Sequence, residues 1–198
     1  MRLKKRHIFL ASKSPRRAEL LTQMGISYEI ISISVPEIPI ENESCDDYVF
    51  RLAQEKAQAG AKTLSEEELL VIGADTVIFF NDRILEKPIN EQDAFNMLTS
   101  LSNNTHLVKT AVSICDRNQC ETIVQTNQVT MAKLTRREIS DYWQTGEPRD
   151  KAGGYAIQGK GAIFIKHIEG SYSGIMGLPI YETARLLNKF GTQPGIIR

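Results

Sequence analysis

The spacing of apolar residues along the chain predicts both strands and helices. Short runs that are continuously apolar, or that alternate with polar residues, predict strands, whereas apolar residues three and four positions apart predict helices. Residues 69–80 form the most apolar run, interrupted at Gly73-Ala74-Asp75-Thr76, which indicates a central strand covered on both faces. The predicted strands are residues 8–11, 28–33, 69–80, a short strand ending at 86–88, 108–115, 122–132 and a strand near 162–168.

Capping residues mark the ends of the predicted helices. Ser14 is a good helix cap, and Pro15 fits the first helical position because its missing N–H would have no partner there. Gly25 suits the end of this helix, and Thr135 to Glu138 has the spacing of a capping box. Further helices are predicted at residues 44–61, 90–101 and 178–190.

The order of these elements predicts a mixed α/β fold. Strand–helix units come early in the chain and hairpins later, which is typical of a sheet covered by helices. We expect a single domain over residues 1–190, followed by a C-terminal tail at residues 191–198.

The composition is that of an ordinary globular protein. Of the 198 residues, 41% are hydrophobic and 24% are charged. The 24 basic and 24 acidic side chains cancel, which argues against a nucleic-acid-binding protein but leaves room for a local cationic site. No apolar run approaches the roughly 18 residues of a membrane span, and the N-terminus lacks a secretory signal. We therefore expect an intracellular protein without membrane or nucleic-acid partners.

Cysteine and histidine give no sign of a metal or redox site. Cys45, Cys115 and Cys120 are odd in number and lack CxxC spacing, so reduced thiols in a cytosolic protein are the simplest interpretation. The three histidines are scattered and form no HExxH pattern, which argues against a zinc site built from histidine.

The turn before the first helix is a candidate anion site. The N-terminus of a helix presents unpaired N–H groups and a partial positive charge. Arg16 and Arg17 fall in this first turn, where acidic residues are usual, and an anionic ligand would offset the cost of placing cations there. The alternative is a pair of surface arginines that bind Glu19 or other acids.

Three further charged residues stand out by position. Lys56 follows Leu52 by four residues and so falls on or beside the buried stripe of its helix, where a lysine either extends to the surface or enters a cleft. Asp75 interrupts the most apolar run, where a cation, a divalent metal or local backbone N–H groups would satisfy its carboxylate. Lys87 ends a predicted strand before Pro88, either near the same cleft or simply exposed.

Six motifs occur together in the chain. They are LASKSPRR (10–17), RLAQEKA (51–57), IGADTVI (72–78), EKP (86–88), DKAGGYAIQG (150–159) and GLP (177–179). In order and spacing the chain resembles the Maf family of nucleotide pyrophosphatases from about Ile8 to Phe190. The resemblance implies a long twisted sheet flanked by helices with a substrate cleft between two lobes, and a cytoplasmic homodimer. It also implies hydrolysis of a nucleoside triphosphate to the monophosphate and pyrophosphate, supported by Mg²⁺ or Mn²⁺.

The resemblance also assigns roles to single residues. Asp75 matches the catalytic proton acceptor and metal ligand, and Glu37 is the best match to a second metal ligand. Four residues match substrate-binding positions, of which the last three lie around the phosphates in the family: Ser12, Arg17, Lys56 and Lys87.

Three positions resemble the members of the family that act on dTTP and UTP. These have Arg, Thr and Gln where this chain has Arg16, Thr76 and Gln158, whereas relatives acting on 7-methyl-GTP carry Trp, Gln and Glu. An amide donates and accepts hydrogen bonds, so Gln158 could complement a uracil or thymine edge, the alternative being a turn residue without base contact. The leading hypothesis is a dTTP and UTP pyrophosphatase. Alternatives are a nucleotide-binding regulator of septum formation and a 7-methyl-GTP pyrophosphatase.

Overall fold

The strands form one mixed sheet, and their order departs from chain order. The computed structural model describes residues 6–65 and 68–195. Strands hydrogen-bond in the order β2-β1-β3-β5-β6-β7, with β4 paired to β3. The chain divides into two compact units, one formed by the described residues of Met1–Asp75, Thr110–Gln125 and Gly177–Arg198 and the other by Thr76–Lys109 and Thr126–Met176. The strands β3 (Leu69–Phe80), β5 (Thr105–Cys115) and β6 (Cys120–Met131) contribute to both units. The predicted α/β class is confirmed, and the single domain over residues 1–190 stays a prediction.

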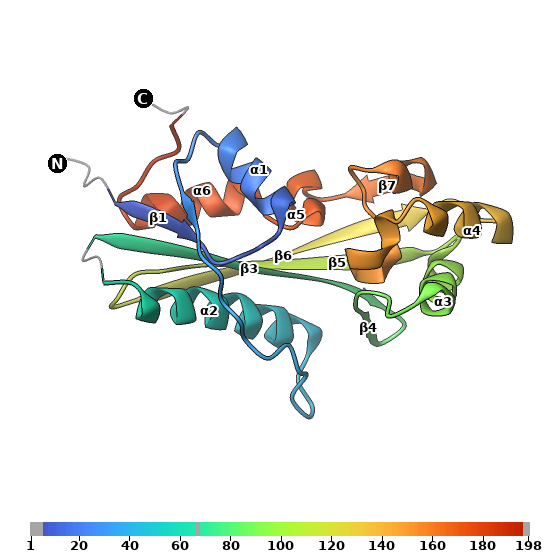
Figure 1. Ribbon diagram of the computed structural model, residues 1–198, viewed down its shortest axis with the longest axis horizontal. Coiled ribbons are helices and arrows are strands. Elements are labelled where there is room, and N and C mark those ends of the chain that lie inside the picture. Colours follow the sequence, from blue (N-terminus) through green and yellow to red (C-terminus); the bar gives the residue numbers. More distant parts are fainter. Residues whose placement is uncertain (1–5, 66–67, 196–198) are drawn as a thin grey trace. The chain divides into compact units, whose positions relative to one another are not determined.

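The first unit contains the parallel part of the sheet. The strand β1 (His7–Leu10) pairs in parallel with both β2 (Glu29–Ile30) and β3. The helices α1 (Pro15–Gln23) and α6 (Ile180–Lys189) lie on one face and α2 (Cys45–Thr63) on the other (Figure 1). Because both faces are covered, the residues of β3 from Leu69 to Asp75 are all buried, as predicted for a central strand.

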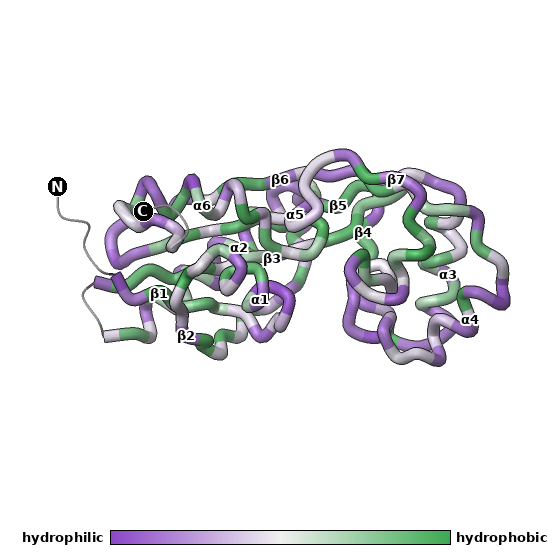
Figure 2. The backbone as a smooth tube through the Cα atoms, turned by 90° about the horizontal axis from the view of Figure 1, so that it is seen from above, coloured by the Kyte–Doolittle hydropathy of each residue, from purple (hydrophilic) through white to green (hydrophobic). Residues whose placement is uncertain are grey.

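The second unit is built on antiparallel pairs. The strand β4 (Arg83–Leu85) forms a hairpin with β3, and β7 (Ile165–Glu169) pairs with β6. The helices are α3 (Glu91–Leu101), α4 (Arg136–Gln144) and α5 (Tyr172–Met176), with 3₁₀ turns at Glu147–Asp150, Ala152–Gly154 and Lys160–Phe164. Only Ile139 and Tyr142 are buried in α4, which is mostly hydrophilic in Figure 2. The core of the second unit includes Ile78, Leu98, Leu101, Val108, Val129, Met131, Ile157 and Phe164.

The capping predictions hold at the backbone level. Gly25 follows α1 with a φ of +68°, and Thr135 and Glu138 form both hydrogen bonds of a capping box. Ser14 is the cap residue of α1, but its side chain makes no capping hydrogen bond. The first turn of this helix thus keeps backbone donors for another partner.

Several predicted boundaries were wrong. The strand β3 has the predicted bounds, Leu69–Phe80, whereas the strand expected at 28–33 has only two residues because β2 pairs only with Phe9 and Leu10 of β1. Residues expected as strand from 162 instead form a 3₁₀ turn that ends at Phe164. The last helix begins at Ile180, since Pro179 takes the cap position, and the short helix α5 was not predicted. Of the predicted tail, Pro194 is buried and residues 196–198 lie outside the described part.

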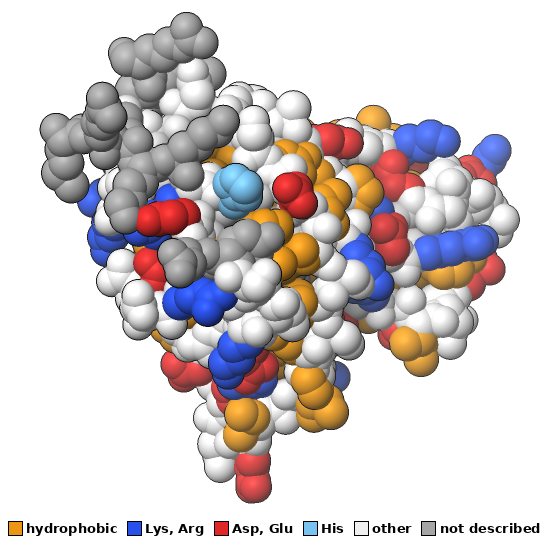
Figure 3. All heavy atoms as spheres, turned by 60° about the vertical axis from the view of Figure 1, so that its left-hand side comes forward, with side chains coloured by type: hydrophobic (Ala, Val, Ile, Leu, Met, Phe, Trp, Pro, Cys, Tyr) orange, Lys and Arg blue, Asp and Glu red, His pale blue; other side chains and the backbone are white. Residues whose placement is uncertain are grey.

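A disulfide corrects the expectation of three reduced thiols. The β5–β6 hairpin turns at residues 116–119 and brings the Cα atoms of Cys115 and Cys120 to 4.1 Å, and the two sulfur atoms are bonded. Among the described residues, Cys45 takes no part in a disulfide, and it is buried. Within the described residues, no helix is both long and apolar enough to cross a membrane. Basic and acidic side chains are interspersed in Figure 3, in keeping with a formal net charge of zero.

Candidate active site

The helix α2 packs directly on β3 at Gly73, two residues before the candidate catalytic aspartate. A Cβ atom at Gly73 would collide with the carbonyl oxygen of Ala53 and lie 2.6 Å from the nitrogen of Ala57. Both contacts belong to α2, so the absence of a side chain at Gly73 lets the helix backbone approach the strand. This contact brings Lys56 on the helix next to Asp75 on the strand.

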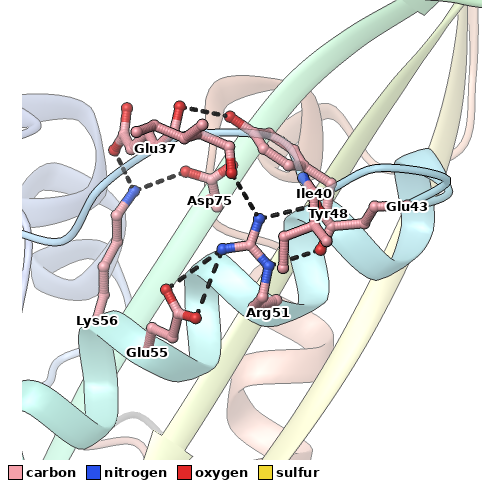
Figure 4. A network of polar contacts seen from close by, with 9 residues as sticks. Glu37, Ile40, Glu43, Tyr48, Arg51, Glu55, Lys56 and Asp75 are labelled. Carbon is pink, nitrogen blue, oxygen red and sulfur yellow. Dashed lines mark hydrogen bonds and ion pairs between the residues drawn. The ribbon is translucent and has the colours of Figure 1, made fainter.

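Two carboxylates meet on the ammonium group of Lys56. Its Nζ atom donates to Oδ1 of Asp75 at 2.7 Å and lies 2.6 Å from Oε1 of Glu37 (Figure 4). The side chains of Lys56 and Asp75 are 12% and 10% exposed, whereas that of Glu37 is 46% exposed. The predicted position of Lys56 beside the buried stripe is confirmed. The carboxylate of Asp75 is satisfied by a cation, one of the alternatives left open above.

These carboxylates are suitable donors for a hard divalent cation. In the described part of the chain, no three His, Cys, Asp or Glu side chains gather where they could hold a metal ion. Magnesium, however, commonly takes only one or two carboxylates from the protein and completes its shell with water and substrate phosphates. Glu37 and Asp75, placed together by Lys56, fit that pattern.

Arg17 lies in the same unit and is held by two contacts. Its Nε atom donates to the carbonyl oxygen of Gly177 at 2.8 Å, and Nη1 donates to Oγ of Ser12 at 3.1 Å. Desolvation lowers the pKa of Arg17, while the negative charge of Asp75 raises it and the positive charge of Arg16 lowers it further. The guanidinium is therefore close enough to the aspartate for their charges to interact, and residues from motifs 10–17, 51–57, 72–78 and 177–179 gather in the first unit.

Ser12 supports the turn that precedes α1. Its Oγ atom accepts hydrogen bonds from the backbone N–H of Ser14, at 3.2 Å, and from Arg17. The first turn of α1 holds no acidic residue. The predicted anion site therefore has a helix N-terminus, two adjacent arginines and a serine hydroxyl, which together suit phosphate oxygens.

The other three predicted site residues lie in the second unit. Thr76 follows Asp75 in β3, so the two side chains point to opposite faces of the sheet. Lys87 and Gln158 are exposed. Their convergence with Asp75 stays a prediction.

Motifs 86–88 and 150–159 are nevertheless brought together within the second unit. The N–H of Gly153 donates to the carbonyl oxygen of Glu86 at 2.9 Å. Gly153 has a φ of +63°, and a Cβ atom there would meet the side chain of Ile78 at 2.5 Å. Glycine is therefore required where this loop crosses β3, next to the segment that carries Lys87.

The loop that carries Gln158 is anchored by a residue that sequence reasoning missed. The carboxylate of Glu147 accepts hydrogen bonds from the hydroxyl of Tyr142 at 2.7 Å and from the N–H groups of Lys160 and Gly161 at 2.9 and 3.0 Å. Tyr142 in turn accepts from the N–H of Ala156 at 3.1 Å. These bonds lower the pKa of Glu147 against its partial burial. No local pattern in the sequence distinguishes Glu147 from other acids.

Arg51 and Glu43 also went unassigned. They are joined by two hydrogen bonds beside the site, at 2.6 and 2.8 Å (Figure 4). Arg51 lies inside motif 51–57, and this was the only signal in the sequence.

Comparison with known proteins identifies the family. The family model described as "Maf-like protein" matches residues 7–190. A protein of Alkalilimnicola ehrlichii named dTTP/UTP pyrophosphatase is 50% identical over 188 residues, which cover 93% of each chain. One of the same name from Pseudoalteromonas atlantica is 50% identical over 184 residues, covering 92% of this chain and 96% of the relative.

A solved structure, the Staphylococcus aureus Ham1 protein, covers 64% of this chain and 72% of its own. At a TM-score of 0.45 and 15% sequence identity, this similarity is too low for a conclusion about this chain. The family model and the relatives, in contrast, span nearly the whole chain. The chain belongs to the Maf-like protein family.

Proposed function

We propose that this protein hydrolyses dTTP and UTP to the corresponding monophosphate and pyrophosphate. Relatives that are about half identical over almost their whole length carry that activity in their names. The observation that carries the proposal is the cluster in which Lys56 joins the carboxylates of Asp75 and Glu37, with Arg17 as a neighbour. Such a cluster has the cations for a triphosphate and a base for a water molecule.

In the proposed reaction, Asp75 acts as the general base. A water oxygen bonds to the α-phosphorus while Asp75 accepts a proton from the water, and the bond to the α–β bridging oxygen breaks. Pyrophosphate leaves with the electron pair of that bond. A positioned general base of this kind contributes a factor of roughly 10² to 10⁴ to the rate.

The cations of the first unit bind and orient the phosphates. The guanidinium of Arg17 offers a planar set of donors, and its hydrogen bonds to Gly177 and Ser12 fix its position. Such preorganised donors stabilise negative charge as it develops on the phosphates. Lys56 contacts both carboxylates and is proposed, from the family resemblance, to bind the phosphates. Lys87 is proposed, from the family resemblance, to bind the phosphates as well.

Glu37 and Asp75 would hold the divalent cation, Mg²⁺ or Mn²⁺. When bound, that ion supplies positive charge to the phosphate oxygens. The experimental test is to add chelator and then titrate each metal back, with hydrolysis and metal binding both followed.

Base selection is assigned to Arg16, Thr76 and Gln158. The amide of Gln158 stands on a loop whose backbone is tied to Glu147, so its donor and acceptor are presented from a fixed segment. A uracil or thymine edge offers the complementary donor and acceptor.

The proposal is tested by product analysis. UTP incubated with the protein and Mg²⁺ should yield UMP and pyrophosphate in equal amounts, separated by ion-exchange chromatography. Orthophosphate as the first product would contradict cleavage of the α–β bond. Values of kcat/KM for UTP, dTTP and 7-methyl-GTP then decide the base class, with 7-methyl-GTP expected to be the poorest substrate.

The family resemblance further leads us to propose a cytoplasmic homodimer. Light scattering on the purified protein tests the dimer, and fractionation of cells tests the location. The Cys115–Cys120 disulfide weighs against a reducing compartment, since disulfides are rare in the cytosol. Thiol labelling of the protein isolated under acid quench would show whether this pair is bonded in the cell.

A further inference from the structure

The segment that carries Glu37 has no regular structure of its own. Residues 31–44, between β2 and α2, contain neither helix nor strand, and residues 36–42 are exposed. Yet the carboxylate of Glu37 lies 2.6 Å from Lys56. Contacts with residues outside the segment must therefore hold the Glu37 carboxylate in that position.

A bidentate ion pair provides one anchor. Arg51, on α2, donates from Nε to Oε1 of Glu43 at 2.6 Å and from Nη2 to Oε2 at 2.8 Å. The side chains of Arg51 and Glu43 are only 20% and 8% exposed. The guanidinium holds the pKa of Glu43 below its ordinary value, so the pair stays charged at neutral pH.

Both members of this pair also hold the backbone of the segment. Arg51 donates from Nη2 to the carbonyl oxygen of Ile38 at 3.0 Å, and Oε2 of Glu43 accepts from the N–H of Ile40 at 3.1 Å. The hydroxyl of Tyr48 donates to the carbonyl oxygen of Glu37 itself at 3.3 Å. Figure 4 shows these contacts converging from α2 on the segment next to Lys56 and Asp75.

The helical spacing explains why one face of α2 can bind the segment that carries Glu37. Tyr48, Arg51 and Glu55 are three and four residues apart and therefore share a face. The guanidinium of Arg51 lies 5.6 Å from the ring centre of Tyr48, which restricts both side chains. Only an arginine offers a planar fork that binds both oxygens of Glu43 and still reaches a carbonyl group.

We propose that Arg51 is a positioning residue for the metal site. Through Glu43 and the carbonyl of Ile38 it fixes the segment, and thereby places the Glu37 carboxylate beside Asp75. In this role Arg51 acts through Glu43 and Ile38 and needs no contact of its own with substrate or metal. The inference rests on the proposed function, because it assigns to Glu37 a role in binding the divalent cation.

The first test reads the position of the segment directly. Hydrogen exchange of a peptide covering residues 36–44 should become at least 10-fold faster in Arg51→Gln. Because this change leaves a nearly buried carboxylate without its cation, the double variant Glu43→Gln, Arg51→Gln serves as a second variant without that charge. Glu55→Gln is the matched control, since Glu55 also touches Arg51, at 3.4 Å, but not the segment. Unchanged exchange in Arg51→Gln and in the double variant would overturn the proposal.

The second test measures the affinity of the protein for a divalent metal ion. Binding of Mn²⁺ without nucleotide is measured from the electron paramagnetic resonance signal of the free ion. The affinity for Mn²⁺ should weaken about 10-fold in Arg51→Gln, which is the loss typical when residues that position a metal ligand are removed. The Mn²⁺ concentration for half-maximal hydrolysis should rise equally, while kcat at saturating metal changes less than threefold. Glu55→Gln should match the unchanged protein, and Arg51→Lys should recover little because it lacks the fork.

A comparison with Glu37→Gln separates the two proposals. If Glu37→Gln loses Mn²⁺ affinity, adding Arg51→Gln should cause no further loss, because Arg51 acts through Glu37. If Glu37→Gln weakens Mn²⁺ binding but Arg51→Gln does not, Arg51 has no positioning role and the proposed metal site still stands. If Glu37→Gln leaves both Mn²⁺ binding and hydrolysis unchanged, the proposed metal site is wrong, and the role of Arg51 is overturned with it.

Discussion

Lys56 and Asp75 form a short ion pair between a helix and the strand beneath it. Their charged atoms lie 2.7 Å apart, and both side chains are nearly buried. Taking charges out of water is costly unless they are paired, so each of these two charges needs a partner of opposite sign. The pair is possible because Gly73 lets α2 lie directly against β3. Close packing at one glycine thus places the two residues on which the proposed chemistry depends.

Replacing Asp75 tests the proposed base. Asp75→Asn keeps the shape of the side chain but cannot accept a proton, so kcat for UTP should fall by roughly 10² to 10⁴. Lys56 keeps its contact with Glu37, and the melting temperature should change little. Steady-state kinetics and circular dichroism measure the two quantities. Activity within a few-fold of the unchanged enzyme would remove Asp75 from this role.

Adding a methyl group at Gly73 tests the close contact of α2 with β3. The new Cβ would meet the backbone of Ala53 and Ala57, so the helix must shift away from the strand. We expect Gly73→Ala to lower the free energy of unfolding by about 1–3 kcal/mol. Hydrolysis should fall as well, since Lys56 moves away from Asp75. Denaturant melts and kcat provide the measurements.

Gly146→Ala is the matched control for that change. An added Cβ at Gly146 has nothing within 4 Å, so only its φ of +77° opposes the substitution. This variant should lose about 1 kcal/mol and keep its activity. Equal losses of activity in the two variants would mean that the packing at Gly73 is not what positions the site.

The buried histidine predicts a dependence of stability on pH. His106 is 2% exposed, its Nε2 atom lies 2.7 Å from the hydroxyl of Tyr155, and its Nδ1 atom has no partner among the described residues. Burial lowers the pKa of His106 from 6.5 to about 4. Between pH 4 and 6.5 the unfolded chain therefore binds a proton that the folded protein does not.

The unfolding free energy should consequently decrease as the pH falls from 6.5 to 4 and then show no further loss from this group. The loss amounts to about 3 kcal/mol by pH 4, at 1.36 kcal/mol for each pKa unit. Carboxylates also titrate in this pH range, so the contribution of His106 is measured as the difference in unfolding free energy between the protein and His106→Gln. Denaturant melts of the protein and of His106→Gln should differ in slope between pH 4 and 6.5. Parallel curves would contradict a depressed pKa at His106.

Glu147 should matter for substrate selection through the loop that carries Gln158. Glu147→Ala removes the acceptor of two backbone N–H groups and of the Tyr142 hydroxyl. Each lost bond costs about 1 kcal/mol, so the melting temperature should fall. With Gln158 no longer fixed, we expect KM for UTP to rise about 10-fold and the preference for UTP over 7-methyl-GTP to shrink.

Glu169→Ala is the control for the loss of an acid, because Glu169 is exposed on β7. It should leave both the melting temperature and the ratio of kcat/KM values unchanged. A Glu147→Ala enzyme that is less stable but equally selective would show that the network is structural only.

The sequence by itself determined the local features of this protein. Capping residues, apolar spacing and turn residues act over a few positions, so the ends of α1, the start of α4 and the hairpin of β5 and β6 could be predicted from them. Motifs could assign Asp75, Lys56 and Arg17 to a site because their spacing resembles a family. The central strand at residues 69–80 was likewise predicted from its apolar run, but the need for glycine at position 73 became clear only from its packing against α2.

Only the tertiary structure decided which side chains meet. Lys56 joins two carboxylates, from residues 19 positions away in either direction along the chain, Arg17 donates to a carbonyl 160 residues away, and Cys115 is bonded to Cys120. Arg51 and Glu43 were given no role from the sequence, and nothing in their spacing indicated that they pair beside the segment of Glu37. The reason is physical: ion pairs and hydrogen bonds require contact within about 3–4 Å, and packing of distant segments creates that contact.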